Sequence, residues 1–301
     1  MALNREDRAR IAQETLDIVN QGFYYNRKGE KIDVSMDIES AKKYAKLYCA
    51  EKLETIGRKA KEKLYEKSSN IEHHDSFEAS GQDFYLEVTN ETTLSAAKRL
   101  YDQGYDVVCL NFASARNPGG GFLKGSDAQE ESLARASALY STLKTQPEYY
   151  RINKACESAL YTDNMIYSPG VPVFRDDNGA LQDRPYKISF ITAPAVNAGV
   201  VEKKEPENIP FIGEIMEKRI QLILALAAYR GHNAVVLGAF GCGVFKNNPE
   251  NVAGYFADCF YDKAGNPSGF SFLFSHVTFA VLDRSKTKNT YRIFSQKLSR
   301  G

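Results

Sequence analysis

The sequence of 301 residues has no surplus of charge of either sign and no long hydrophobic run. Its 39 Lys and Arg residues against 38 Asp and Glu residues give a formal charge of +1. This balance excludes a global electric field that would recruit nucleic acid or an anionic membrane surface. The longest nearly apolar run, residues 234–245, is about half of the roughly 20 residues that cross a bilayer. We therefore expect no direct binding to nucleic acid or to membranes.

Cysteine and histidine are scarce, and neither is spaced as metal ligands usually are. No CxxC pair occurs, which argues against a disulfide framework and a zinc site; the five cysteines are Cys49, Cys109, Cys156, Cys242 and Cys259. His73 and His74 lie in a polar, acidic stretch and are expected to be exposed rather than to bind a metal. The first residues, MALNREDRARIAQ, lack the apolar core of a secretory signal. The sequence thus predicts a cytoplasmic protein with free thiols and no metal.

Two parts with different patterns follow one another along the chain. Overall, 43% hydrophobic and 26% charged residues are typical of a globular protein. Residues 4–20 and 35–67 show the spacing of amphipathic helices, and residues 1–80 carry equal numbers of basic and acidic side chains. Those charges indicate solvated helix faces rather than a basic arm for phosphate backbones. We predict an N-terminal helical extension over residues 1–80 and the main domain over residues 81–301.

From about residue 83, apolar runs of strand length alternate with amphipathic segments of helix length. The expected strands are 84–88, 107–112, 188–192, 234–237 and 279–282, and the expected helices are 92–101, 129–145, 209–230 and 249–260. Residues 170–186 resemble a hairpin inserted at the surface. The alternation predicts an α/β fold whose sheet is covered by helices on both faces.

Two glycine-rich loops follow apolar strands. The first, residues 111–121, ends in three consecutive glycines, and the second spans residues 238–250. Loops after the C-terminal ends of strands are where open α/β sheets bind ligands. The second loop leads into a helix, with Asn248 as its N-cap and Pro249 as its first residue, and such a helix start offers free N–H groups to a phosphate. It fits neither the Walker pattern nor the dinucleotide fingerprint, and each loop alone could equally be a tight turn.

Gln129, Glu130 and Glu131 stand seven residues after the three glycines, at the head of the expected helix 129–145. The helix dipole favours acidic residues at this position, and helix stabilisation alone would explain them. Beside the glycines, however, the carboxylates would hang over a pocket whose floor can hold a diphosphate. The combination therefore favours a ligand site over a simple helix start.

The segment NFASARNPGGG, followed by seven residues and QEE, resembles the signature of the poly(ADP-ribose) glycohydrolases. The wider stretch, from TTLSAAKRL through TAPAVN to LGAFGCGVFKNNP, is similar to the microbial type of that family over roughly residues 83–285. The resemblance implies a macrodomain-like catalytic domain, a three-layer α/β/α sandwich with a mixed sheet. It also implies release of ADP-ribose from protein-linked chains, with no cofactor or metal.

The resemblance assigns roles in the first loop and the helix after it. Glu131 would protonate the departing oxygen of the ribose–ribose bond and then assist the attacking water. Glu130 would hold hydroxyls of the terminal ribose. The pocket for the ribose and the diphosphate would be shaped by Gln129, Asn117, Gly119, Gly120 and Gly121.

The resemblance also assigns roles elsewhere. Phe245 would pack against the terminal ribose, and Asn90 stands where many macrodomains place an adenine-contacting Asp. The diphosphate would be wrapped by Gly241, Cys242, Gly243, Val244 and Phe245.

Glu130 and Glu131 are neighbours in sequence, so on a helix they point in different directions. They cannot flank a bond as the paired carboxylates of most glycosidases do, and a single acid/base carboxylate aided by the substrate's own diphosphate fits better. The same carboxylates would serve hydrolysis of mono-ADP-ribose from a side chain, and a non-catalytic ADP-ribose reader is a further alternative. The expected partner is ADP-ribose or an ADP-ribosylated protein, bound by a monomer.

Overall fold

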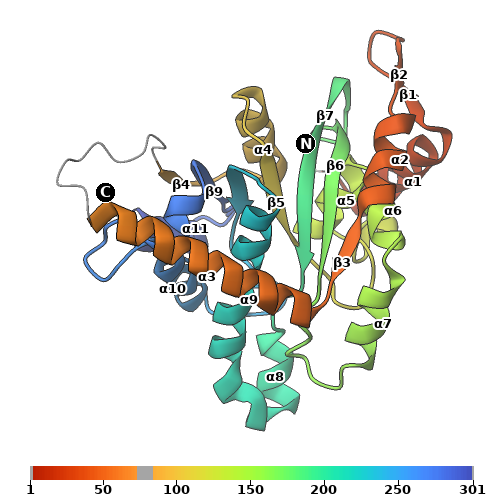
Figure 1. Cartoon of the computed structure of the whole chain (residues 1–301). Coiled ribbons are helices and arrows are strands. Elements are labelled where there is room, and N and C mark those ends of the chain that lie inside the picture. Colours follow the sequence, from red (N-terminus) through yellow and green to blue (C-terminus); the bar gives the residue numbers. More distant parts are fainter. Residues whose placement is uncertain (1–2, 73–83, 300–301) are drawn as a thin grey trace.

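The computed structural model describes residues 3–72 and 84–299, and its centre is a seven-stranded mixed sheet (Figure 1). The strand order is β3-β6-β7-β5-β8-β9-β4. The last five strands of this order are parallel, whereas β6 is antiparallel to both of its neighbours. The strands are β3 (Lys46–Tyr48), β4 (Tyr85–Thr89), β5 (Val107–Phe112), β6 (Met165–Arg175), β7 (Leu181–Ala193), β8 (Ala234–Leu237) and β9 (His276–Ala280).

Helices and short turns connect these strands, and a separate hairpin of β1 (Phe23–Tyr25) and β2 (Lys31–Asp33) lies outside the sheet. The helices are α1 (Arg5–Gln21), α2 (Ser35–Tyr44), α3 (Ala50–Glu72), α4 (Thr93–Asp102), α5 (Gln129–Ala136), α6 (Leu139–Lys144), α7 (Pro147–Ala155), α8 (Ala198–Lys204), α9 (Ile212–Tyr229), α10 (Pro249–Phe260) and α11 (Asn289–Leu298). The 3-10 turns are η1 (Phe122–Lys124), η2 (Pro206–Phe211) and η3 (Gly269–Leu273).

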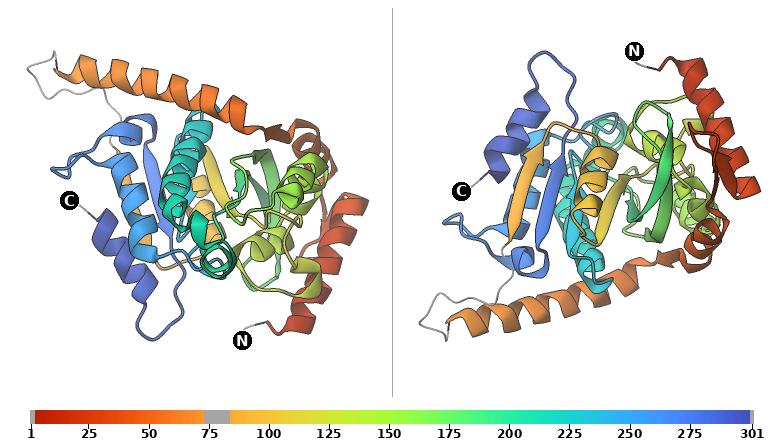
Figure 2. Two further views of the ribbon diagram at one scale, coloured as in Figure 1. Left: turned by 90° about the horizontal axis from the view of Figure 1, so that it is seen from below. Right: turned by 90° about the horizontal axis from the view of Figure 1, so that it is seen from above.

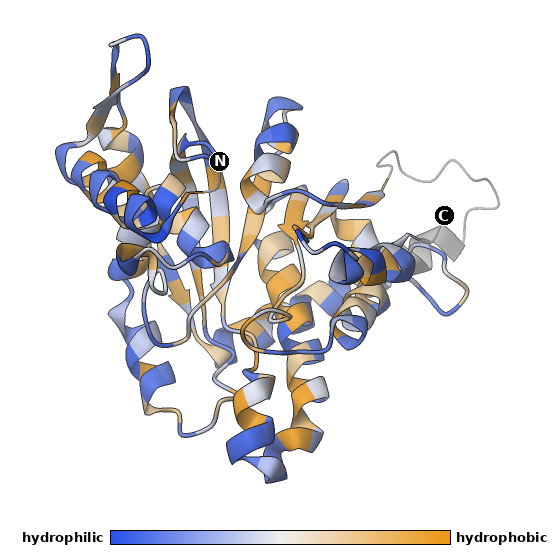
Figure 3. Ribbon diagram, turned by 180° about the vertical axis from the view of Figure 1, so that it is seen from behind, coloured by the Kyte–Doolittle hydropathy of each residue, from blue (hydrophilic) through white to orange (hydrophobic). Residues whose placement is uncertain are grey.

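The helices form two layers, one on each face of the sheet (Figure 2). Side chains alternate along each strand, so Val108 and Leu110 of β5 pack under α3, α9, α10 and α11. Val107 and Cys109 face the opposite layer, which contains α1, α2 and α4–α7. Hydrophobic residues accordingly concentrate on the strands and on α9 (Figure 3). The predicted three-layer α/β/α sandwich with a mixed sheet is confirmed.

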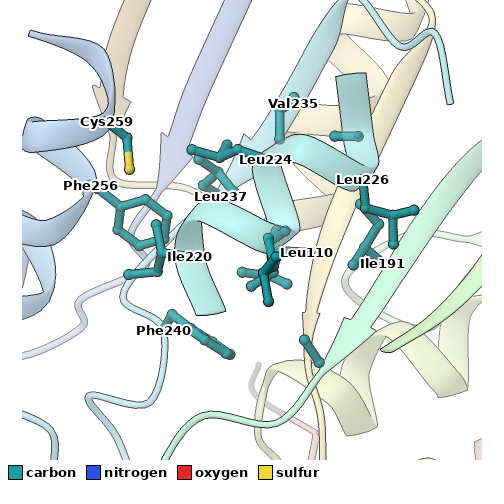
Figure 4. Packing of buried hydrophobic residues seen from close by; sticks show 14 of the residues in the cluster. Leu110, Ile191, Ile220, Leu224, Leu226, Val235, Leu237, Phe240, Phe256 and Cys259 are labelled. Atoms are coloured by element: carbon teal, nitrogen blue, oxygen red, sulfur yellow. The ribbon is translucent and has the colours of Figure 1, made fainter. Parts of the chain in front are cut away.

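The C-terminal half of helix α9, residues 222–228, is apolar on all sides because α9 packs between the sheet and two other helices, α3 and α10. Leu224 and Ile220 of α9 lie among Leu110 and Val235 of the sheet and Phe256 of α10 (Figure 4). This rigid layer supports the loops that leave the C-terminal ends of β5, β7 and β8.

The helical stretch expected over residues 35–67 is confirmed in two parts, and the expectation is wrong between them. Its helical spacing is interrupted by β3, which pairs antiparallel with β6 in the register Leu47↔Ile166. Hydrogen bonds to an edge of the sheet outweigh the local pattern, and the segment becomes α2, β3 and α3.

Two other expected helices also need correction. The helix over 129–145 breaks between α5 and α6, where Ser137 takes an extended backbone with φ of −145° and bridges Val173 of β6. The helix over 209–230 begins as the 3-10 turn η2, which contains Pro210 without the N–H that an α-helix needs.

The expected hairpin 170–186 exists, but it is wrong as a surface insertion. Its arms belong to β6 and β7, strands of 11 and 13 residues within the main sheet. The strand expected over 279–282 is displaced and runs over His276–Ala280. The strands expected over 107–112 and 234–237 and the helix expected over 249–260 are confirmed.

The predicted boundary between residues 80 and 81 lies outside the described residues, as do His73 and His74. The division into an extension and a catalytic domain stays a prediction. In the described part of the chain, β3 joins the main sheet, and no helix there is long and apolar enough to cross a membrane.

Candidate active site

The two glycine-rich loops leave β5 and β8, which are neighbouring parallel strands, at the same edge of the sheet. The rings of Phe112 and Phe240, one near the start of each loop, lie 5.7 Å apart. Gly238 is needed there, because a Cβ would lie 3.0 Å from Cζ of Phe112 and 2.7 Å from the carbonyl oxygen of Ala280. The loops therefore begin side by side.

Gln129, the first residue of α5, fastens this helix to the end of β5. Its Oε1 accepts the N–H of Phe112 at 2.9 Å, and its Nε2 donates to the carbonyl oxygen of Leu110 at 2.8 Å. Nε2 also donates to Oγ1 of Thr93 in α4 at 3.1 Å. Because its amide bonds to protein on both sides, Gln129 fixes the helix N-terminus that carries the two glutamates.

Glu131 bridges the start of α5 and the third glycine of the first loop. Its Oε1 accepts the N–H of Gly121 at 2.9 Å, and its Oε2 accepts the N–H of Ala128, the N-cap residue, at 3.2 Å. The side chain thus folds back over the first turn, as the Glu of a capping box does. The residue is buried, with 9% of its surface exposed, and two backbone N–H groups hold its carboxylate in place.

Glu130 points into the interior instead. Its Oε2 accepts the N–H of Ser114 at 2.7 Å, and its Oε1 accepts a bond from Nδ2 of Asn111 at 3.3 Å. The residue is 3% exposed, and this burial, with the neighbouring charge of Glu131 as a smaller cause, raises the pKa of Glu130 to about 8. At neutral pH the Glu130 carboxyl is therefore mostly uncharged.

The three glycines pass close to both carboxyl groups. Gly119 and Gly120 have left-handed φ angles of 66° and 58°, a conformation that other residues rarely adopt. A Cβ on Gly120 would lie 3.0 Å from Cδ of Glu131 and 3.2 Å from Oε2 of Glu130. Glycine is required here both for the backbone conformation and for the close approach.

Helix α1 holds the far end of the first loop, around η1. Arg5 donates from Nε to the carbonyl oxygen of Lys124 at 3.0 Å, and Arg8 donates to that of Gly125 at 2.8 Å. Gly125 has a φ of 72°, and a Cβ on it would collide with the carbonyl group of Arg5. The N-terminal part of the chain therefore helps to shape this loop, a contact that the sequence did not predict.

The second loop is braced at its base and open at its tip. Gly241 has a φ of 75°, and Nδ2 of Asn247 donates to its carbonyl oxygen at 3.1 Å. The same Nδ2 donates to the carbonyl oxygen of Val196, in the segment after β7, at 2.7 Å. Nothing lies within 4 Å of a Cβ built on Gly243, and Val244 is 82% exposed.

Phe245 and Cys242 are half-buried in the second loop. The Phe245 ring lies 6.2 Å from that of Tyr161, and its carbonyl oxygen accepts the N–H of Gly199 in α8 at 3.0 Å. Burial raises the pKa of the Cys242 thiol to about 12, so this thiol stays protonated and unreactive at neutral pH.

Comparisons with known proteins find relatives over most of the chain. The family model for the microbial-type PARG (poly(ADP-ribose) glycohydrolase) catalytic domain matches residues 12–176. The crystal structure of the PARG from Thermomonospora curvata is 39% identical with a TM-score of 0.86, and the match covers 97% of this chain and 99% of that one. The chain belongs to the microbial-type poly(ADP-ribose) glycohydrolases.

Two further PARG structures hold ligands. The T. curvata enzyme bound to the inhibitor ADP-HPD is 39% identical, with a TM-score of 0.83 and coverage of 97% of this chain and 99% of that one. The PARG from Deinococcus radiodurans in complex with ADP-ribose is 39% identical, with a TM-score of 0.74 and coverage of 87% and 96%. The comparison with curated proteins gives no match. The predicted family and hydrolase class are confirmed.

Asn90 and Asn117 of this family member lie at the edges of the arrangement. Asn90 pairs with the backbone of Asp283, accepting its N–H at 3.0 Å and donating to its carbonyl oxygen at 3.3 Å. It thereby ties the ends of β4 and β9 together. Asn117 is exposed, and its carbonyl oxygen accepts the N–H of Gly120 at 3.0 Å, which shapes the glycine turn.

Sequence reasoning missed two residues that support the second loop, Tyr161 and Arg219. Arg219 is fully buried in α9. A signal existed, because it falls in helical phase with the buried residues Met216, Ile220 and Ile223. Tyr161 carries no such signal, since its left-handed φ of 56° is set by contacts distant in sequence.

Within the described residues, no group of three or more His, Cys, Asp or Glu side chains is arranged to hold a metal ion. A groove of about 840 Å³ lies away from the glutamates, between α4 and the turn joining β6 to β7. Its walls include Arg27, Lys98, Asp177 and Tyr186. It offers a concave surface apart from the candidate site, against which the predicted place of ADP-ribose can be tested.

We expect Glu130→Gln to change how stability depends on pH. The pKa of Glu130, raised to about 8 in the folded chain, exceeds its ordinary value of 4.5, so the folded chain holds a proton that the unfolded chain releases. The stability from this group is present at low pH and is lost as the pH rises through about 8. Because Gln does not titrate, the melting temperature of the variant relative to wild type should rise between about pH 5 and about pH 9.

The matched control is Glu148→Gln, in an exposed glutamate of the first turn of α7 that pairs with Arg151. It should show no such rise. If the melting temperatures of wild type and Glu130→Gln differ by the same amount at every pH in this range, the result contradicts a buried, neutral carboxyl.

Proposed function

We propose that this member of the family hydrolyses the ribose–ribose bonds of poly(ADP-ribose) with Glu131 as general acid and base. The observation that carries the proposal is the packing of the Glu130 and Glu131 carboxyls against the backbone of Gly120. Two carboxyl groups thus lie at a left-handed glycine turn beside a helix N-terminus, and membership of the family supports a glycohydrolase reaction there.

In the proposed reaction, protonated Glu131 gives its proton to the bridging ribose oxygen as the bond from that oxygen to the anomeric carbon breaks. The bond's electron pair leaves with the oxygen, and the terminal ribose becomes oxocarbenium-like. Water then attacks the anomeric carbon and gives a proton to the Glu131 carboxylate, which restores the acid. Two backbone N–H groups, from Gly121 and Ala128, hold the carboxylate during both transfers.

The proposed role of Glu130 is to orient the terminal ribose through its hydroxyls. Because its pKa is raised to about 8, Glu130 adds little negative charge next to Glu131 and the substrate's diphosphate at neutral pH. Asn111 and Ser114 fix the carboxyl from behind, which supports a positioning role.

The diphosphate would lie along the second loop, from Gly241 to Phe245, with Phe245 against the terminal ribose. The open tip around Gly243 and Val244 and the N-terminus of α10, capped by Asn248, support this placement. Gln129 and Asn117 would contribute by shaping the first loop, and Asn90 by fixing the backbone of Asp283 beside the adenine.

We further propose a cytoplasmic monomer whose partners are ADP-ribose and ADP-ribosylated proteins, with no direct binding to nucleic acid or membranes and no cofactor. The five free cysteines and the balanced charge support this part.

The experiment is incubation of the full chain with purified poly(ADP-ribose) and with peptides carrying a single ADP-ribose on Ser, Arg or Glu. Free ADP-ribose is then measured, with calorimetry for ADP-ribose binding in parallel. We expect release from the polymer and micromolar binding, on the order of −8 kcal/mol. Release from the mono-modified peptides alone would overturn the proposal in favour of a mono-ADP-ribosyl hydrolase. Binding of ADP-ribose without any release would overturn it in favour of a reader. The absence of both binding and release would overturn it altogether.

A further inference from the structure

Tyr161 lies in the segment between α7 and β6, and its ring faces the second loop. Its centroid is 6.2 Å from that of Phe245, with the rings inclined by 40°. Tyr161 has a left-handed φ of 56°, and Lys246, next to Phe245, has a φ of 59°. Residues other than glycine are strained in this conformation, which persists only where surrounding contacts enforce it. The backbone at Tyr161 and the backbone next to Phe245 are therefore held in place by contacts with the rest of the molecule.

Arg219 supplies much of that enforcement from inside the fold. It donates from Nε to Oδ1 of Asp163 at 2.9 Å and from Nη2 to the carbonyl oxygens of Leu160 at 3.1 Å and Tyr161 at 3.3 Å. Its Nη1 donates to the carbonyl oxygen of Pro194 at 3.0 Å. A buried guanidinium is costly unless its donors are bonded, and here each nitrogen has a partner. Arg219 thus binds the carbonyl groups immediately before and after the Cα atom of Tyr161.

The same segments hold the second loop. The N–H of Asn197 donates to the carbonyl oxygen of Ala159 at 2.9 Å, which joins the segment after β7 to that of Tyr161. Gly199, just beyond, donates its N–H to the carbonyl oxygen of Phe245 at 3.0 Å. Phe245 is therefore fixed through its backbone by α8 and through its ring by Tyr161.

We propose that Tyr161 is a positioning residue that fixes the ring of Phe245 against the terminal ribose of the substrate. The proposal rests on the proposed role of Phe245 as the ribose contact. Tyr161 acts through its ring, which is inclined by 40° to that of Phe245, so its hydroxyl is dispensable. Without the ring, Phe245 keeps its backbone bond to Gly199 but gains rotational freedom, and the ribose is presented less often to Glu131.

The test is a double-mutant cycle on the full chain. Tyr161→Asn removes the ring while Asn tolerates the left-handed backbone, and Tyr161→Phe keeps the ring. We expect Tyr161→Asn to lower kcat on poly(ADP-ribose) about tenfold with a smaller change in KM, and Tyr161→Phe to restore kcat to within about twofold of wild type. In a Phe245→Ala background, Tyr161→Asn should change kcat by less than about twofold. An equal loss with and without Phe245, or an equal loss in Tyr161→Phe, would overturn the proposal.

A second readout does not depend on turnover. With 4-fluorophenylalanine placed at position 245, Tyr161→Asn should shift and broaden the fluorine resonance, whereas Tyr161→Phe should not. Tyr229→Asn, in an exposed tyrosine at the far end of α9, is the matched control. An unchanged fluorine resonance in Tyr161→Asn would overturn the proposal whatever the activity. A wild-type chain that releases no ADP-ribose would instead overturn the proposed function. The fluorine resonance would still show whether Tyr161 fixes the ring of Phe245.

Discussion

Glu131→Gln should lose at least about 100-fold in the rate of ADP-ribose release from poly(ADP-ribose), the lower end for removal of a general acid–base group. The amide cannot deliver the proton to the departing oxygen or take one from water. In wild type, one carboxylate oxygen accepts the N–H of Gly121 and the other accepts the N–H of Ala128, whereas the amide has a single oxygen for these two donors. Because Glu131 acts mainly in the transition state, affinity for ADP-ribose should change only a few fold.

The matched control is again Glu148→Gln, the same change in the first turn of another helix, and its rate should equal that of wild type. Rates and ADP-ribose affinities of the three proteins are measured side by side. Equal turnover by Glu131→Gln and wild type would show that Glu131 is not the acid. A fall in affinity as large as the fall in rate would show that it serves ground-state binding instead.

The second large effect is expected for Gly120→Ala. The added methyl group would lie 3.0 Å from Cδ of Glu131 and 3.2 Å from Oε2 of Glu130, so both carboxyl groups or the loop must move. A displacement of about 1 Å at reacting groups can cost on the order of 100-fold in rate, and we expect a loss of that size.

Gly104→Ala separates this clash from backbone strain. Gly104, in the turn after α4, has a left-handed φ of 87° and no atom within 4 Å of a built Cβ. Both variants should lose stability, by about 1 kcal/mol from the unfavourable φ alone, but only Gly120→Ala should lose activity. Steady-state rates and melting temperatures of the two variants test this, and an active Gly120→Ala would contradict the contact between the glycine turn and the carboxyl groups.

Much of the α5 region could be predicted because its signals are local. Consecutive glycines indicate a backbone conformation that other residues rarely adopt, and acidic residues are typical of a helix N-terminus. The sequence did not reveal that the Glu130 carboxyl is bonded behind the helix by Asn111 and Ser114, whereas that of Glu131 folds back onto Gly121 and Ala128, because these partners are set by the tertiary fold.

The remaining misses have a common physical cause, which is the dependence of local structure on distant partners. β3 has three residues, and its partner Ile166 is far along the chain, so the helical spacing around Leu47 gave the wrong element. The strained backbone of Tyr161, between α7 and β6, is held by Arg219 of α9, which donates to its carbonyl oxygen. No window of sequence contains both members of these pairs.

The most direct test is a crystal structure of Glu131→Gln with ADP-ribose bound. The account predicts the terminal ribose between the turn at Gly119–Gly121 and the ring of Phe245, with a ribose hydroxyl on the Glu130 carboxyl and the diphosphate along the second loop. ADP-ribose bound instead in the groove between α4 and the β6–β7 turn, or with its adenine toward Glu130, would contradict it.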